Sequence, residues 1–233
     1  MWLSTATSTD EAARAADVAV LPIGSFEQHG VHLPLATDTL IAGIIARRVA
    51  TAYNLFLLPP ITFGCSHEHA GFPGSVSISS TTLHAIVTDI ATSLTQAGTH
   101  KLAIINGHGG NYVLSNIVQE ANVAGPRMIL FPHSRDWKDA RTAAGCETTN
   151  HDDMHGGEAE TSILLAEAPD LVRDTDRDAD HLADDRRHLL TAGIRGYAEA
   201  GTIGRPSLAH AEKGRGLLDA FSRLFKDSLA QLR

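Results

Sequence analysis

Short apolar segments alternate with longer amphipathic segments along much of the chain. The short segments are rich in Val, Ile and Leu, as buried strands are. They are residues 17–24, 55–61, 101–107 and 127–133. The longer segments carry apolar residues at helical spacing. They are residues 37–53, 79–98 and 112–124. This alternation predicts crossover connections and a mostly parallel central sheet flanked by helices on both faces.

Polar and small residues mark the ends of two predicted helices. Thr37 or Asp38 lies near the expected N-cap of the helix in residues 37–53. A serine cap begins the helix in residues 79–98, and Gly98 takes the position after its end. These signals indicate where the helices begin and end relative to the strands.

The rest of the chain is more polar, up to a final amphipathic segment. Residues 168–188 are dense in mixed charge, which is typical of a solvated loop and helix face. Residues 201–216 are glycine-rich but lack the spacing of a phosphate- or dinucleotide-binding loop, so we expect a surface loop. Residues 217–233 predict an amphipathic helix that closes the core. We expect residues 1–233 to form a single α/β domain, a three-layer sandwich.

Composition narrows the classes of function. Of the 233 residues, 43% are hydrophobic and 20% charged, as in globular proteins. The net charge of −8, with scattered Lys and Arg, argues against nucleic acid as a partner. No apolar run reaches the roughly 18 residues that span a bilayer, and the N-terminus has no signal-peptide pattern. Cys65 and Cys146 lack C-x-x-C spacing. We therefore expect reduced thiols, no membrane partner and a cytoplasmic protein.

The segment "FEQHGVHLPLATDTL", residues 26–40, gathers residues that bind metals elsewhere. Glu27 and His29 flank Gln28, so their side chains point the same way if the chain is extended. Asp38 follows at the start of a predicted helix, after a loop that could turn it back on the pair. Oxygen and nitrogen ligands of this kind suit zinc, manganese or iron. On spacing alone, a hydrogen-bonded polar loop remains the more common arrangement.

Two further clusters carry histidine or glutamate beside glycines. In "NGHGGN", residues 106–111, His108 directly follows a predicted strand. In "HDDMHGGEAETS", residues 151–162, histidines and glutamates precede an apolar helix. A tight turn, or a carboxylate favoured by the helix dipole, would explain each cluster alone. In parallel sheets, however, ligands bind beyond the carboxyl ends of the strands, where we expect three polar loops to meet. They are "GSFEQHG", "NGHGGN" and "PHSRDW", residues 24–30, 106–111 and 132–137.

Four blocks together resemble the creatininase (creatinine amidohydrolase) family. They are "PIGSFEQHGVHLPLATDT", "FGCSHEHAGFPGSVSIS", "NGHGGN" and "HGGEAETS", and they cover roughly residues 18–170. Their order and spacing fit the family, whereas "NGHGGN" alone would not be specific. The resemblance implies two divalent metal ions per chain at the carboxyl edge of the sheet.

Family roles are carried over residue by residue. The resemblance implies that Glu27 binds one ion, His29 binds the other and Asp38 binds both, while His108 completes the shell of the first ion. In creatininase proper, a glutamate two residues after that histidine binds the second ion. This chain has Gly110 there. The glutamate of "ETS" is implied as its replacement, and it is Glu160.

The resemblance also implies catalytic and substrate-binding residues. His155 matches the family's proton-transfer histidine, which would stabilise the tetrahedral intermediate or protonate the leaving nitrogen after attack by metal-activated water. His69 and His151 are candidate substrate contacts. Glu68 and His69 match an "EH" pair found in many members, where shaping the site or contacting another subunit is the expected role. His32 is expected to support the site or the fold.

The residues that the sequence lacks narrow the choice of substrate more than those that it contains. The tryptophans that enclose creatinine in creatininase proper have no clear counterparts here, so creatinine is a poor candidate. Other members hydrolyse formamides or trim the precursor peptide of mycofactocin, and the chain's length and motifs lean toward the latter group. We predict a metal-dependent amidohydrolase acting on a small-molecule amide, a formamide or a short peptide. A homo-oligomer, commonly a hexamer in this family, is implied by resemblance only.

Three alternatives remain open. Creatinine hydrolysis is one of them. The residue at Gly110 leaves open a member of the family that binds metal as a scaffold without hydrolysis. A dinucleotide-binding oxidoreductase fits the alternation of strands and helices, but the sequence lacks its glycine fingerprint and its acidic ribose partner.

Overall fold

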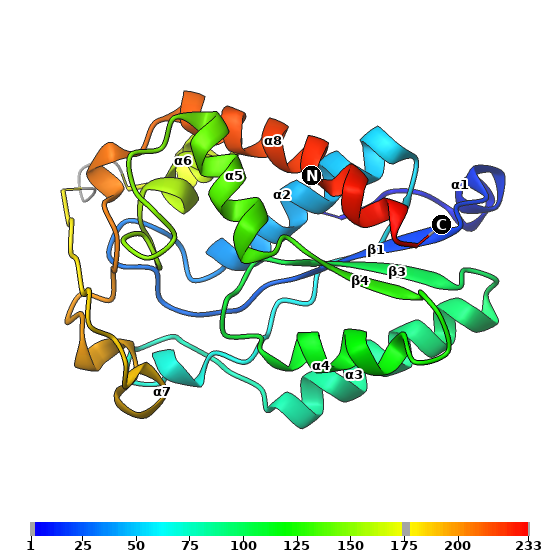
Figure 1. The fold of residues 1–233 in the computed structure, drawn as a ribbon, viewed down its shortest axis with the longest axis horizontal. Helices are drawn as coiled ribbons and strands as arrows, with labels where there is room; N and C mark the ends of the chain where they lie inside the picture. Colours follow the sequence, from blue (N-terminus) through cyan, green and yellow to red (C-terminus); the bar gives the residue numbers. More distant parts are fainter. Residues whose placement is uncertain (1–2, 174–177, 233) are drawn as a thin grey trace.

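A central parallel sheet lies between two layers of helices in the computed structural model, which describes residues 3–173 and 178–232 (Figure 1). The strands lie in the order β2-β1-β3-β4, and every pair is parallel. They are β1 (Val18–Ile23), β2 (Phe56–Leu57), β3 (Lys101–Asn106) and β4 (Met128–Phe131). The described α-helices are α1 (Ser8–Arg14), α2 (Thr37–Tyr53), α3 (Ser80–Gln96), α4 (Val113–Ala121), α5 (Ser134–Ala144), α6 (Glu158–Glu167), α7 (Leu189–Ala192) and α8 (Ala211–Ala230).

Alternation along each strand builds two cores. Figure 1 shows α3 and α4 on the lower face of the sheet and α2, α5, α6 and α8 on the upper face. In β1, Val18 and Val20 join the core under α2, α6 and α8, whereas Ala19, Leu21 and Ile23 join the core under α3 and α4. Successive strand side chains point to opposite faces, so a strand covered on both sides is apolar throughout. The predicted three-layer α/β sandwich is confirmed.

Most predicted elements occur where the sequence indicates them. Helix α2 has the predicted bounds, and Gly98 follows the end of α3 with a φ of 93°. Strand β2 is shorter than the predicted 55–61, since Pro59 and Pro60 follow it closely. The N-cap of α2 is Ala36, which provides no side-chain hydrogen bond, and Thr37 and Asp38 follow it in the first turn, near the N-cap as predicted.

Two predictions for the C-terminal half are wrong. Residues 201–216 are not a surface loop, because Thr202 and Ile203 are buried and α8 begins at Ala211. Helix α5 occupies the stretch after the fourth strand, where only a polar loop was expected. The prediction for the charged segment 168–188 partly concerns residues 174–177, which lie outside the described residues; most of the remaining segment is exposed.

The described helices are all too short or too polar to cross a membrane.

Glycine contacts in two helices lead to a matched pair of stability predictions. A Cβ on Gly214 of α8 would overlap the Ser162 carbonyl of α6, whereas a Cβ on Gly43 of α2 meets nothing within 4 Å. We expect Gly43→Ala to raise the free energy of unfolding by about 0.5–1 kcal/mol through helix propensity. We expect Gly214→Ala to lower it by about 1–3 kcal/mol through overpacking. Urea unfolding of both variants checks this, and a stabilising Gly214→Ala would contradict the close packing of α6 on α8.

Candidate metal centre

Five of the predicted site residues meet beyond the carboxyl ends of β1 and β3. Glu27 and His29 lie in the loop after β1, and Asp38 lies in the first turn of α2. His108 follows β3, and Glu160 lies in the first turn of α6. Helix N-termini favour carboxylates, which suits the places of Asp38 and Glu160. The Glu27 N–H donates to the Leu35 carbonyl (3.0 Å), which turns the loop back as the sequence suggested.

Ligand atoms fall into overlapping sets that share one carboxylate. In one set, the side chains of Glu27, Asp38 and His108 offer atoms within 4.8 Å of one another. In another, His29, Asp38 and Glu160 do the same. Asp38 reaches both, with Oδ2 3.0 Å from His108 Nδ1 and Oδ1 2.9 Å from His29 Nε2. Asp38 therefore lies between the two sets of ligand atoms and belongs to both.

Backbone carbonyls set the orientation of three histidine rings. His29 Nδ1 donates to the Glu27 carbonyl (3.0 Å), His108 Nε2 to the Cys65 carbonyl (3.0 Å) and His155 Nε2 to the Gln28 carbonyl (2.6 Å). These tautomers, assigned from the hydrogen-bond partners, leave the other ring nitrogen facing the carboxylates. Metal-binding histidines are oriented in this way by a hydrogen bond from their second nitrogen.

The carboxylates lack the usual positive partners. Among the described residues, neither Glu27, Asp38 nor Glu160 forms an ion pair with Lys or Arg. Both side-chain oxygens of Glu27 are fully buried without a hydrogen-bond partner. His69 Nε2 and His108 Nδ1 lie 3.1 and 3.2 Å from Glu27 Oε1, but neither contact is aligned as a hydrogen bond. A buried carboxylate without hydrogen bonds is costly, so the donor set around Glu27 fits a divalent cation such as zinc, manganese or iron.

Electrostatics within the cluster shift several pKa values. Burial works against a charged His29, but the neighbouring Asp38, with smaller contributions from Glu160 and Glu27, raises its pKa to about 9. Burial raises the pKa of Glu160 to about 7, although the charge of His29 opposes this. Burial, and after it the positive charge of His29, hold the pKa of His155 well below its ordinary value. The cluster therefore attracts positive charge at His29 and keeps His155 neutral.

His69 is oriented differently from the other histidines. The Gln28 amide donates to His69 Nδ1 (3.0 Å) and to the Gly201 carbonyl (3.2 Å), while its oxygen accepts from the Gly30 N–H (2.8 Å). His69 therefore carries its proton on Nε2, which faces Glu27. His69 is buried, so a substrate contact by this ring remains a prediction. Gln28 was not predicted as a site residue, because an amide side chain between two candidate ligands does not by itself indicate a metal site.

The other predicted residues differ in their burial and in whether they join the cluster. His155 joins the cluster, since it forms a further set of ligand atoms with Glu27 and His29. His32 is buried and its Nε2 contacts the Thr161 hydroxyl at 3.0 Å, which is a supporting role. His151 is exposed in the loop between α5 and α6, outside the cluster, and its carbonyl accepts from Arg186 (2.8 Å). A substrate contact by His151 stays a prediction.

A buried ion pair holds the start of α6. Its N-cap is Gly157, which has no side chain, and the Asp153 carboxylate accepts from the N–H groups of Glu158 (2.5 Å) and Ala159 (3.0 Å) instead. Arg141 of α5 donates to the same carboxylate at 2.7 Å. The position of Glu160 depends on this contact. Asp153 and Arg141 were not predicted as site residues, because their contact forms only when the fold brings α5 beside the loop before α6.

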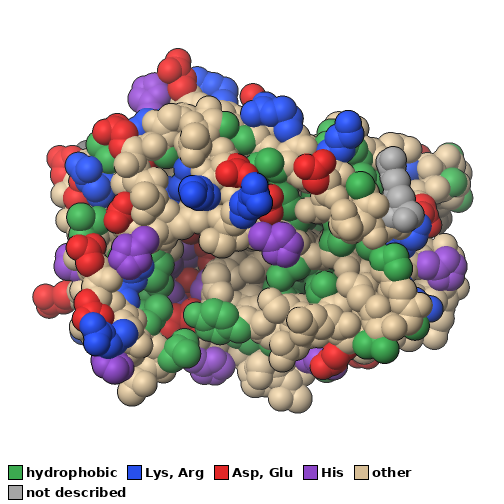
Figure 2. Space-filling view, viewed as in Figure 1, with side chains coloured by type: hydrophobic (Ala, Val, Ile, Leu, Met, Phe, Trp, Pro, Cys, Tyr) green, Lys and Arg blue, Asp and Glu red, His purple; other side chains and the backbone are tan. Residues whose placement is uncertain are grey.

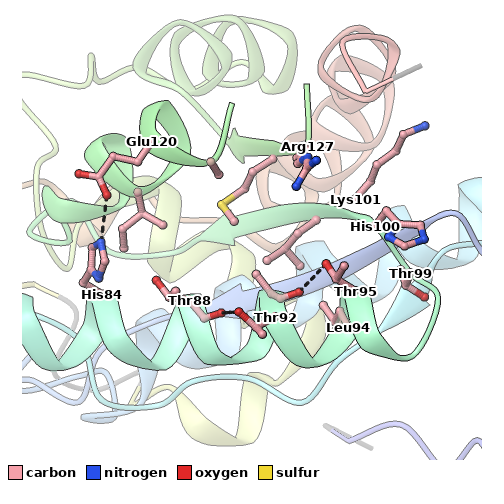
Figure 3. Close-up of a pocket in the computed structure, with 15 residues that line it drawn as sticks. His84, Thr88, Thr92, Leu94, Thr95, Thr99, His100, Lys101, Glu120 and Arg127 are labelled. Atoms are coloured by element: carbon pink, nitrogen blue, oxygen red, sulfur yellow. Dashed lines mark hydrogen bonds and ion pairs between the residues drawn. The ribbon is translucent and has the colours of Figure 1, made fainter. Parts of the chain in front are cut away.

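A cavity gives access to the cluster. It has a volume of about 350 Å³, and His108, Glu160, Trp137 and Met154 are among the residues that line it. Figure 2 shows a hollow at the left of this face with histidine and acidic atoms inside. Another cavity, of about 280 Å³, lies between α3 and α4 near the amino ends of β3 and β4 (Figure 3). It lies at the edge of the sheet opposite the cluster and is lined by no residue of the cluster.

The fold and the cluster define an α/β protein with a candidate metal centre beyond the carboxyl ends of its strands. Over residues 3–228 the sequence matches the Creatininase family, described as creatinine amidohydrolase. The chain therefore belongs to the creatininase family, and it is a hydrolase of carbon–nitrogen bonds.

Similar proteins include peptidases and creatininases. The mycofactocin precursor peptide peptidase of Mycobacterium ulcerans (strain Agy99) is 33% identical over 227 residues, 91% of this chain and 83% of that protein. The creatinine amidohydrolase of Pseudomonas putida is 32% identical over 180 residues, 70% of this chain and 69% of that protein. A crystal structure of creatininase has a TM-score of 0.83 at 28% identity, over 97% of this chain and 95% of that chain. Other solved creatininases are described as a manganese form and as a mutant of Zn–Zn type.

The Asp153–Arg141 pair provides a stability prediction. Asp153→Ala leaves Arg141 as an unpaired buried charge and removes the cap of α6, so we expect a loss of about 3–5 kcal/mol in the free energy of unfolding. Asp185 is a matched control, because its 2.9 Å pair with Arg187 is exposed. We expect Asp185→Ala to leave the free energy of unfolding close to that of the wild type, because solvent screens an exposed ion pair. Equal losses in the two variants, measured by urea unfolding, would contradict the capping role.

Proposed function

We propose that the protein is a metal-dependent amidohydrolase with a binuclear centre, and that it cleaves an amide bond in a peptide. The observation that carries the proposal is the sharing of Asp38 between a Glu27–His108 set and a His29–Glu160 set. Paired metal positions of this kind suit hydrolysis, since two divalent ions supply Lewis acidity and lower the pKa of water. The manganese and Zn–Zn forms of solved creatininases favour these two metals over iron.

The chain's own residues would orient the reaction and move its proton. Glu27, Asp38 and Glu160 provide the negative charge that holds the cations. His155 is fixed through Nε2 by the Gln28 carbonyl, so its Nδ1 faces the cluster, 3.8 Å from Glu27 Oε1. A neutral imidazole in this place can accept a proton and deliver it to the leaving nitrogen. The Ser25 hydroxyl donates to Asp38 Oδ2 (2.8 Å) and so supports that carboxylate, and attack by water needs no side-chain nucleophile.

A peptide is the substrate class that the comparisons favour. The curated relative that aligns over 91% of this chain is named for cleaving a precursor peptide. The cavity supports this choice, because Trp137 is the one Phe, Tyr or Trp among the described residues that line it. Its ring centroid lies 4.8 Å from that of Phe221, on which the ring packs. A single ring does not enclose a planar substrate between two aromatic walls. Creatinine remains the second candidate, on the similarity to the enzyme of Pseudomonas putida.

We also expect a homo-oligomer, on the family resemblance alone. Light scattering of the purified protein at several concentrations tests this, and a monomer at all of them would contradict it.

Metal content tests the binuclear centre. We expect about two ions per chain in the wild-type protein and one or fewer in Glu160→Ala. The reason is that the set of His29, Asp38 and Glu160 loses one of its two carboxylates. Glu212→Ala is the control, since Glu212 is exposed on α8 and should leave the content unchanged. Elemental analysis of the three proteins gives the answer. No bound metal in the wild type would overturn the proposal, and unchanged content in Glu160→Ala would show that the ligand set is wrong. Two bound ions without activity on any amide would favour the scaffold alternative.

Proton transfer by His155 predicts a separate effect on rate. We expect His155→Gln to lower kcat by about 10²- to 10⁴-fold on an amide substrate while the metal content stays the same. The substrate panel should contain short peptides, formamides and creatinine. His151→Gln is the comparison, because its predicted substrate contact would raise KM and leave kcat unchanged. Full activity of His155→Gln with both ions bound would exclude the proton-transfer role.

A further inference from the structure

A carboxylate outside the proposed ligand set lies against the ligand His108. Glu68 belongs to the short 3-10 segment η1 (His67–His69), and its Oε1 is 3.4 Å from His108 Nε2. The same nitrogen donates to the Cys65 carbonyl at 3.0 Å. The opposite nitrogen, Nδ1, faces the carboxylates of Glu27 and Asp38. His108 is therefore held between two acceptors behind it and the candidate metal position in front.

Gly110 makes this contact possible. A Cβ at this position would overlap both the Glu68 carboxylate and the His108 ring, and would lie 2.8 Å from the Cys65 carbonyl oxygen. The turn after β3 therefore leaves room for Glu68, which enters from a segment about forty residues earlier in the chain. The side chain of Glu68 is only 15% exposed, so solvent screens this contact weakly.

A carboxylate behind a metal-binding histidine has a known physical effect. It fixes the ring orientation and raises the basicity of the nitrogen that faces the metal, and its loss typically weakens metal binding by about 10- to 100-fold. His108 contributes to the set with Glu27 and Asp38, and not to the set with His29 and Glu160. An effect that acts through His108 should therefore fall on one metal position and spare the other.

We infer that Glu68 is a positioning residue that holds His108, through Nε2, in the orientation that binds the first of the two metal ions. This inference depends on the binuclear centre proposed above. It assigns to Glu68 a selective influence on one ion, which a general role in folding would not have.

Three variants and a control test the inference. Glu68→Ala removes the carboxylate, and Glu68→Gln keeps an oxygen acceptor without the charge. Gly110→Ala keeps the carboxylate but crowds both it and the His108 ring. The control is Glu120→Gln, because Glu120 contacts His84 at 3.1 Å in an exposed pair away from the centre (Figure 3). The measurement is competition for Mn²⁺ and for Zn²⁺ against a chelator, on the full chain, with thermal unfolding of each apoprotein.

The expected pattern is selective. Glu68→Ala and Gly110→Ala should lower the affinity for one of the two ions by about 10- to 100-fold. Glu68→Gln should recover part of that lost affinity. The second ion, and both ions in Glu120→Gln, should bind as in the wild type. Two ions bound with unchanged affinity in Glu68→Ala would overturn the role of Glu68 and leave the binuclear centre intact. An equal loss of affinity for both ions, together with a lower unfolding temperature, would show a structural role for Glu68 in place of the positioning role. A wild-type protein without metal would overturn both proposals.

Discussion

The site depends on one constraint: among the described residues, two buried carboxylates and a partly buried third have no lysine or arginine partner. Glu27, Asp38 and Glu160 lie in one small volume, and both oxygens of Glu27 lack hydrogen bonds. An assembly of this kind is unfavourable in a protein interior unless a cation is drawn into it. Three histidine rings, those of His29, His108 and His155, each donate an N–H to a backbone carbonyl and turn the other ring nitrogen toward the carboxylates. The fold thus holds together ligands that would repel one another by themselves.

The scaffold meets this demand by distributing ligands over rigid elements. Parallel strands bring the loops after β1 and β3 to the same edge of the sheet, and two helix N-termini face that edge with Asp38 and Glu160. Buried hydrogen bonds then fix the loops, above all those of the Asp153 carboxylate at the start of α6. A preorganised site of this kind loses little free energy to reorganisation when it binds its ligands.

The sequence predicted the layers, most elements and the cluster because these depend on local patterns. Strand and helix periodicities located the sheet, and ligand-type residues directly after strands located its carboxyl edge. Family resemblance supplied the pairing of Glu160 with His29, which spacing alone left open. Gln28, Asp153 and Arg141 were missed because they act through contacts that only the tertiary structure creates. The early start of α8 was missed because glycines such as Gly214 read as a loop, although the packing on α6 requires them.

The segment between the end of α6 and the start of α8 contributes no residue to either candidate metal set, within the part of it that the structure describes. It is nevertheless joined to the site, because Ile203 exchanges backbone hydrogen bonds with His155. The metal-ligand sets and this segment therefore lie in different parts of the chain. Within residues 178–200, Leu190 and Arg195 line a pocket together with Glu68 and Gly110, so changes in this segment would alter the surroundings of the site and leave its ligand residues unchanged.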